Sequence, residues 1–183
     1  MAGHDWLVGG DRRAVATDHI YAAATDLISR DGLDAFDIDT LAARVHCSRA
    51  TIYRHVGGKA QIRDAVLIRG AGRIVDEVRR SVEGMSGPDR VVTAISVALE
   101  QIRSDPLGRL MFSSTAAPEL SGLPTSPVLG GLAADLAGIT GDDPPAAQWI
   151  VRVVLSLVYW PIGDSMVEYE MLQRMVAPAF GAG

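Results

Sequence analysis

Cysteine is almost absent from this chain of 183 residues, which holds only Cys47. A single thiol cannot close an internal disulfide, so the sequence excludes a secreted module held together by disulfides. The N-terminal segment 1–13 also lacks the apolar run of a secretion signal. We therefore expect a protein of the reducing cytoplasm.

Long apolar runs are missing as well. The most apolar stretch, residues 146–160, contains Gln148 and Arg152 and stops at Pro161, whereas a membrane-spanning helix needs about 20 apolar residues. We expect no membrane partner. The stretch is interpreted instead as a buried helix or an interface helix.

Catalytic motifs are not found either. The histidines show no metal-ligand spacing, and no glycine-rich phosphate loop follows a strand. The segment FSSTAAPE at 112–119 has hydroxyl groups but no histidine near it in sequence. We expect no enzyme, no metal and no cofactor. A hydrolase that depends on Ser113 is the weaker alternative.

What the chain does contain is helical patterning. Apolar residues make up 48 % of the sequence, which excludes a disordered chain. They recur at spacings of three and four, and no segment alternates as a strand would, so the sequence predicts an all-α fold. The cap and break signals place the helices, with a loop at 116–127, as follows: 12–31, after Asp37, after Ser48, from Lys59, 91–102, 128–139, after Asp143 and after Asp164 to about 177.

Positive charge is concentrated in one segment of an acidic protein. The net charge is −5, yet residues 38–69 hold six arginines and lysines against two aspartates. This asymmetry is typical of a segment that contacts DNA, although a solvated charged helix would also produce it.

Within that segment, CSRATIYRHVGGK at 47–59 has the pattern of a DNA-reading helix. Ile52 and Val56 would anchor it, and a tight turn before Ser48 completes a helix-turn-helix arrangement. Arg49, at the helix start, suits guanine, and Ala50 suits a thymine methyl group. Hydroxyl, imidazole and ammonium groups around the helix would bind phosphates. The candidate DNA-binding residues are Ser48, Arg49, Ala50, Thr51, Tyr53, Arg54, His55 and Lys59.

The segment FDIDTLAARVHCSRATIYRHVGGK, preceded by IYAAATDLISRDG, resembles the DNA-binding domain of the TetR family of bacterial regulators over residues 12 to about 63. The resemblance implies that the third helix reads bases and that Tyr53, His55 and Lys59 hold the DNA backbone. It also implies that the rest of the chain is a helical domain that binds a small molecule and dimerises through its last two helices.

Two residues of the turn depart from that family. His46 stands where the family usually has glycine, so any positive φ there must be adopted by a side chain that tolerates it less well. Cys47 replaces an aliphatic residue, and we expect it to be a small buried side chain and not a redox switch. His46 either distorts the turn or reaches a phosphate.

The predicted organisation therefore has three parts. They are a flexible N-terminal arm at 1–11, a helix-turn-helix DNA-binding domain at 12–58, and a helical ligand-binding and dimerisation domain at 59–183. The dimer is expected to form through helices at about 145–160 and 164–177, with apolar residues that exceed what a monomer should expose: Trp149, Ile150, Val153, Val154, Leu157 and Val158.

Contacts to a ligand are harder to assign from sequence. The candidates are Met111, Phe112, Trp149, Arg152 and Trp160. The aromatic and methionine side chains suit the core better than a pocket. Arg152 suits an ion pair or a capping contact at the subunit interface before it suits a ligand carboxylate.

The expected function is a homodimeric repressor that binds a palindromic operator in double-stranded DNA and is released by a small, apolar effector. The alternative is a constitutive DNA-binding regulator whose C-terminal core is filled.

Overall fold

The computed structural model describes residues 6–111, 125–139 and 143–181. Over these ranges the chain forms nine α-helices and a short 3-10 helix, and no strand, so the all-α prediction is confirmed. The chain divides into two compact units, residues 1–70 and 71–183. The predicted domain boundary at 58/59 falls where α4 begins, whereas the two units separate within that helix.

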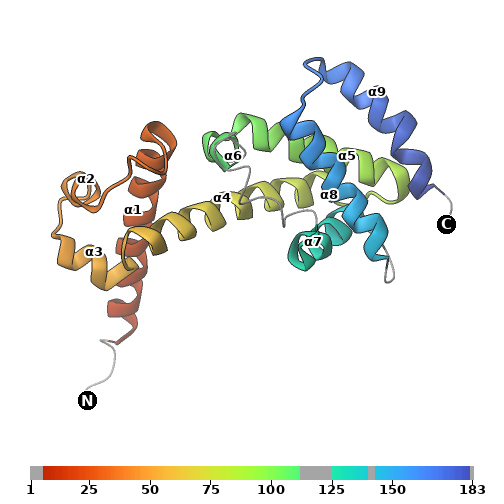
Figure 1. Ribbon diagram of the computed structural model, residues 1–183. Coiled ribbons are helices and arrows are strands. Elements are labelled where there is room, and N and C mark those ends of the chain that lie inside the picture. Colours follow the sequence, from red (N-terminus) through yellow and green to blue (C-terminus); the bar gives the residue numbers. More distant parts are fainter. Residues whose placement is uncertain (1–5, 112–124, 140–142, 182–183) are drawn as a thin grey trace. The chain divides into compact units, whose positions relative to one another are not determined.

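The first unit is a helix-turn-helix assembly in which α1, α2 and α3 pack on one another (Figure 1). Its helices are α1 at Trp6–Asp31, α2 at Ile38–Arg44, α3 at Arg49–Val56 and the first part of α4, which spans Lys59–Ser81. The largest fully buried side chains of this unit come from all four helices and the α1–α2 connection: Ile28, Phe36, Leu41, Ile52, Ile62 and Val66.

The first helix begins earlier than predicted. We expected a flexible arm to residue 11, but α1 already starts at Trp6. Gly9 and Gly10 suggested an arm. Glycine lowers helix propensity by only about 1 kcal/mol per residue, so it disfavours a helix without forbidding one.

The two short helices begin at the predicted caps. The Asp37 carboxylate accepts hydrogen bonds from the backbone N–H of Asp39 (2.7 Å) and of Thr40 (2.9 Å), and the Thr40 hydroxyl lowers the pKa of Asp37 most. Ser48 Oγ accepts from Thr51 N–H at 3.2 Å. Because the pKa of Asp37 is lowered on folding, its stabilising effect is present above the unfolded pKa and is lost as the pH falls through the folded value.

The turn between α2 and α3 contains the positive φ that the sequence analysis considered at His46. His46 has φ = 53°, and it is the only non-glycine residue with positive φ in the described part of the chain. Cys47 is half-buried, less enclosed than predicted. Gly57, with φ = 85°, ends α3.

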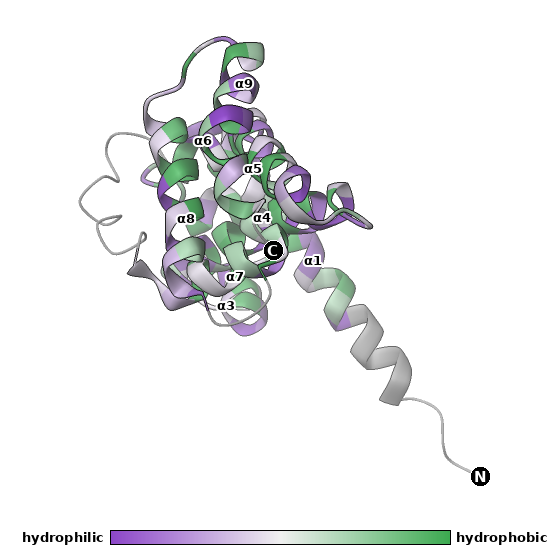
Figure 2. Cartoon of the chain, turned by 90° about the vertical axis from the view of Figure 1, so that its right-hand side faces the viewer, coloured by the Kyte–Doolittle hydropathy of each residue, from purple (hydrophilic) through white to green (hydrophobic). Residues whose placement is uncertain are grey.

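The second unit packs α5, α7 and α8 around one core, with α9 and the 3-10 helix on α5. Each of these helices carries both hydrophobic residues, drawn in green, and hydrophilic residues, drawn in purple (Figure 2). The bounds of its helices are α5 Gly87–Ser104, α6 Pro106–Met111, α7 Pro127–Ala137, α8 Pro144–Tyr159, α9 Ser165–Met175 and the 3-10 helix Ala177–Phe180.

Helix α6 was not predicted. Asp105 and Pro106 were expected to end a helix, and they do end α5. The Asp105 carboxylate then accepts from Leu107 N–H at 2.7 Å and so caps a new helix at once. One acidic residue therefore serves as the end of α5 and the start of α6.

Arg90 joins the ends of two helices inside the second unit. Its guanidinium donates to the carbonyl oxygens of Leu136 and Asp135, both at 2.9 Å, near the end of α7. It also donates to Met85 O at 3.3 Å, just beyond α4. A cation at helix C-termini satisfies carbonyl groups that lack partners within the helix.

A partly buried ion pair, with its carboxylate buried, connects α9 to α5. Arg103 Nη1 and Nη2 donate to the two carboxylate oxygens of Glu168 at 2.8 and 2.7 Å. Arg103 Nη2 also donates to Leu157 O on α8 at 2.9 Å, and the pairing with Glu168 raises the pKa of Arg103. Glu168 is the one buried charged residue among those described. One guanidinium therefore connects three helices.

Replacing Arg103 tests this connection. Arg103→Ala leaves the carboxylate of Glu168 buried without its partner, and we expect a loss of about 2–3 kcal/mol in the free energy of unfolding, measured by urea denaturation. Arg80→Ala is the control, because it removes an exposed pair with Glu77 and should cost less than about 1 kcal/mol. Equal losses in the two variants would contradict the role of the Arg103–Glu168 pair.

Candidate functional site

Helix α3 has one buried and one exposed face. Ile52 and Val56 are 0 % and 7 % exposed and point into the first unit. Arg49, Ala50, Tyr53 and Arg54 are exposed, and Thr51 and His55 are half-buried. Ala50 and Arg54 lie on the side opposite Ile52 and Val56. Arg49, three residues before Ile52, shares the side of the buried pair and is exposed at the first position of the helix. The helix therefore presents polar groups and one small apolar group to solvent, as the sequence predicted.

The start of α3 is held by short polar contacts. Ser48 Oγ lies 3.0 Å from Thr51 Oγ1 as well as capping the helix. Arg49 Nε forms an ion pair with the carboxylate of Asp39, in the first turn of α2. The predicted guanine-reading side chain thus contacts a residue that the sequence analysis did not include.

The end of α3 and the start of α4 form a second group of contacts. Lys59 Nζ donates to Asp34 O at 3.1 Å and remains exposed. Gly58 N–H donates to Gln61 Oε1 at 3.1 Å, and a Cβ on Gly58 would lie 3.4 Å from the ring of Tyr53. A small residue at 58 therefore lets the Tyr53 ring lie close to the backbone.

His55 has a ring nitrogen without a partner. Its Nδ1 is buried and has no hydrogen-bond partner among the described residues.

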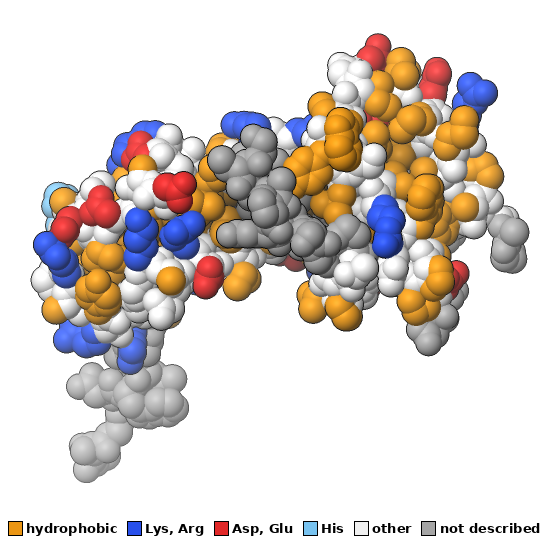
Figure 3. Space-filling model, viewed as in Figure 1, with side chains coloured by type: hydrophobic (Ala, Val, Ile, Leu, Met, Phe, Trp, Pro, Cys, Tyr) orange, Lys and Arg blue, Asp and Glu red, His pale blue; other side chains and the backbone are white. Residues whose placement is uncertain are grey.

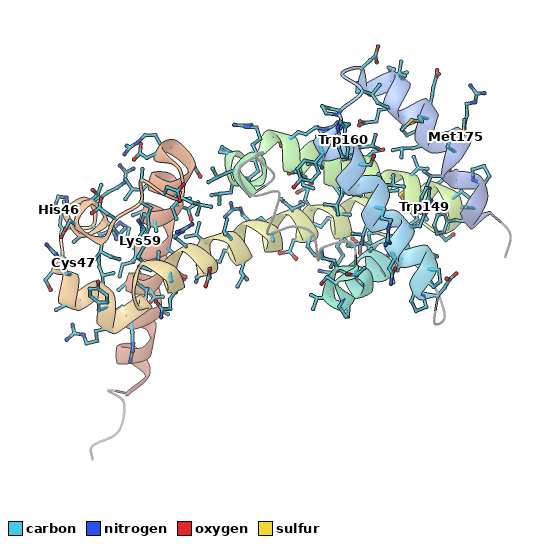
Figure 4. All side chains as sticks on the ribbon, in the orientation of Figure 1. His46, Cys47, Lys59, Trp149, Trp160 and Met175 are labelled. Atoms are coloured by element: carbon cyan, nitrogen blue, oxygen red, sulfur yellow. The ribbon has the colours of Figure 1, made fainter. Side chains whose placement is uncertain are left out.

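The turn residues His46 and Cys47 lie between α2 and α3, and Lys59 lies at the start of α4 (Figure 4). The eight predicted DNA-binding residues thus occupy one helix and the residues that directly flank it, with six of them exposed and two half-buried.

The second unit contains an apolar cavity of about 210 Å³. Every residue that lines it is Ala, Val, Leu or Ile, contributed by α4, α5, α7 and α8. Helix α4 contributes Ala71, Ile74, Val75 and Val78, at the spacing of one helix face. Such a cavity can exclude water and accept an apolar molecule.

The predicted ligand contacts lie elsewhere. Trp149, Arg152 and Trp160 are exposed and do not line the cavity, and Arg152 Nη1 donates to Gln148 O and Oε1, both at 3.3 Å. Phe112 and the side chain of Met111 lie outside what the structure describes. The cavity gives no support to these three exposed residues as ligand contacts.

Helices α8 and α9 carry exposed apolar side chains (Figure 3). Our residue-level prediction for α8 was wrong at Ile150 and Leu157, which are buried in the core of their own unit. Val153, Val154 and Val158 pack against the same core. The large apolar residues that remain exposed on α8, α9 and their connection are Trp149, Trp160, Ile162, Met166, Val167, Tyr169 and Met175.

Sequence reasoning missed two kinds of functional candidate. Asp39 pairs with Arg49 across two helices, and no local pattern marks such a contact. The cavity residues of α4 lie at helical spacing, which the sequence analysis used only to predict helices. Apolar residues at helical spacing show that one face of a helix is buried. They do not show whether that face borders a packed core or an empty cavity.

Across the described ranges, His, Cys, Asp and Glu form no group of three that would hold a metal ion. No helix in the same ranges is both long enough and apolar enough to cross a membrane.

Comparisons with known proteins agree with this arrangement. Residues 20–66 match the family described as "Bacterial regulatory proteins, tetR family". An uncharacterised HTH-type transcriptional regulator of Mycobacterium tuberculosis H37Rv is 30 % identical over 187 residues, covering 97 % of this chain and 91 % of the relative. A DNA-binding transcriptional repressor, TetR, of Mycobacteroides abscessus is 38 % identical over 69 residues, covering 38 % of this chain and 35 % of that protein.

The fold has solved counterparts. The crystal structure of a TetR-like transcriptional regulator from Rhodococcus sp. RHA1 superposes with a TM-score of 0.58 at 20 % identity, covering 87 % of this chain and 92 % of the other. These similar proteins are transcriptional regulators and not enzymes, which confirms the prediction that the chain has no catalytic role. Its helix-turn-helix, its all-helical second unit and its full-length similarity to a bacterial regulator show that the chain belongs to the TetR family of DNA-binding transcriptional regulators.

Proposed function

We propose that this protein is a cytoplasmic repressor that binds a palindromic operator as a homodimer and is released by a small apolar effector. The observation that carries the proposal is the set of exposed side chains on α3: Arg49, Ala50 and Tyr53 are open to solvent while Ile52 and Val56 are buried. The name of the Mycobacteroides abscessus repressor supports the direction of regulation.

DNA would be held by two kinds of contact. Arg49 and Ala50, at the N-terminal end of α3, would meet base edges in the major groove. Ser48, Thr51, Tyr53, Arg54, His55 and Lys59 would bind phosphates on either side. Lys59 is well placed, since a single backbone carbonyl accepts from its ammonium group in the free protein and an ammonium has three N–H donors.

Dimerisation is supported by the exposed apolar residues of α8 and α9. Trp160, which directly follows α8, and Met166, on α9, are 75 % and 68 % exposed, and other exposed apolar residues lie on the two helices and their connection. Apolar patches of this kind mark interaction sites. Because one helix-turn-helix contacts few base pairs, a second copy would supply the second half-site.

The cavity supports regulation by a ligand over the constitutive alternative. A dry cavity of about 150 Å³ with aliphatic and aromatic walls binds benzene, and this cavity is larger, at about 210 Å³. The described residues that line it include no charged group, so a charged effector would lose its hydration without compensation from them. The same helix that begins at Lys59 lines the cavity from Ala71 to Val78, so it is the proposed route from effector to DNA.

A charge deletion at Lys59 tests the DNA contact. Lys59→Ala should weaken binding to a selected operator, and the slope of log K against log salt should fall in magnitude by about 0.9 for each lost phosphate contact. Arg30→Ala is the matched control, since Arg30 pairs with Asp31 at the end of α1. Filter binding at four salt concentrations measures both. An unchanged slope for Lys59→Ala would remove Lys59 from the interface.

A charge inserted on α9 tests the dimer. Met166→Glu should raise the dimer dissociation constant by about tenfold or more, because the interface would bury an unpaired carboxylate. Val128→Glu is the control: Val128 is 79 % exposed on α7 in the same unit. Sedimentation equilibrium measures the constant. A monomeric wild-type protein, or equal effects of the two substitutions, would contradict the proposed interface.

Filling the cavity tests the effector. With n-hexane or 1-hexanol at about 100 times its dissociation constant, the wild-type protein should gain about 2.7 kcal/mol in unfolding free energy, while hexanoate should give no gain. Ala98→Phe, which fills the cavity, should abolish the response, and Ala60→Phe, at an exposed site on α4, should keep it. Thermal shift measures each. No response of the wild-type protein to a broad panel of neutral compounds would favour the constitutive regulator.

A further inference from the structure

The ion pair between Asp39 and Arg49 joins the two helices of the helix-turn-helix at their exposed surface. Asp39 Oδ1 pairs with Arg49 Nε. The two side chains are nevertheless 62 % and 65 % exposed. The pair is therefore accessible to a bound duplex and is not part of the packed core.

Each partner sits at the start of its helix. Asp39 lies in the first turn of α2, where its backbone N–H donates to the Asp37 cap, and Arg49 is the first residue of α3. The partial positive charge at a helix N-terminus favours a carboxylate in the first turn. Asp39 thus places a carboxylate beside the first residue of the reading helix.

The contact of Arg49 Nε with Asp39 leaves the terminal nitrogens of the guanidinium available. Arginine has five N–H donors in one rigid plane, and in the ion pair with Asp39 it is Nε that approaches the carboxylate. The terminal Nη1 and Nη2 groups then keep parallel N–H donors for a bidentate contact. This is the pattern that guanine O6 and N7 accept in the major groove.

An arginine that is already restricted also loses less conformational entropy on binding. An exposed arginine samples many rotamers, and ordering it opposes association. In the proposed role, the ion pair with the Asp39 carboxylate would restrict the side chain before DNA arrives. The same carboxylate repels DNA phosphates. If Arg49 turned from a base toward the DNA backbone, it would leave Asp39 unpaired, with its negative charge beside the duplex.

We propose that Asp39 is a positioning residue for specificity: it holds Arg49 through Nε so that the terminal guanidinium groups select guanine in each half-site. This inference rests on the proposed base contact of Arg49. Asp39 contributes discrimination between sequences, and its negative charge lowers the affinity for DNA in general.

The test uses the full-length protein and duplexes selected from a randomised library by the wild-type chain. Binding of wild type, Asp39→Ala, Arg49→Ala and the double variant is then measured on the selected duplex, on its single-base-pair substitutions and on an unrelated duplex. Asp39→Glu serves as a conservative variant that keeps the carboxylate. Asp64→Ala is the matched control, because it removes one exposed negative charge from α4 in the same unit.

Arg49→Ala should reduce the preference for one G·C pair per half-site by about tenfold. Asp39→Ala should reduce the preference at that same pair by about twofold or more, and the double variant should be no worse than Arg49→Ala alone. Asp39→Glu should recover part of the preference. Both Asp39→Ala and Asp64→Ala should bind the unrelated duplex more tightly, but Asp64→Ala should keep the wild-type preference.

The outcomes separate the two levels of the proposal. If the wild-type chain enriches no duplex, the proposed function itself fails. If it enriches a duplex but Asp39→Ala behaves like Asp64→Ala, only the positioning role fails. A change of preference at a different base pair from that of Arg49 would also overturn it, because Asp39 would then contact a base such as cytosine N4 directly.

Discussion

The burial of Ile52 and Val56 is the constraint on which the DNA-binding unit depends. These two side chains, one helical turn apart on α3, enter the space between the packed helices, and their burial sets the rotation of the helix about its axis. That rotation turns Ala50 and Arg54 outward, and Arg49, the first residue of the helix, is exposed as well. The caps at Ser48 and Gly57 limit α3 to eight residues. Both ends of the helix therefore lie within a turn of a cap that fixes the backbone.

Helix α4 connects the two requirements of the proposed switch. It starts at Lys59, whose ammonium group holds the α1–α2 connection through Asp34 O, and it continues until its apolar face lines the cavity. Arg90 then fixes the segment that follows α4 to the end of α7, another helix of the cavity wall. Under the proposed function, a ligand that favours a different packing of α4 against α7 would act on the same helix that begins at Lys59.

Local signals in the sequence were sufficient for the elements that depend on local chemistry. The helix starts after Asp37, Ser48, Asp143 and Asp164 follow from side chains that accept from nearby N–H groups, and each was predicted. The errors lie where tertiary packing decides. Helix α8 is apolar on more than one side, so its sequence could not show that Ile150 and Leu157 face their own core. The pairing of Asp39 with Arg49 and the empty space in front of Ile74 likewise depend on residues distant in sequence.

Charge pairing within the first unit reconciles an acidic protein with DNA binding. Besides the Asp39–Arg49 pair, Arg44 pairs with Asp26 and Arg69 with Asp18, so the local excess of arginine is partly neutralised by acids on the same surface. Non-specific affinity rises with each phosphate that is neutralised, and paired arginines lower it. A regulator must be judged by its preference for one site over the many competing sites of a genome. In this protein that preference would come from a few oriented side chains on two copies of α3, and not from a large positive field.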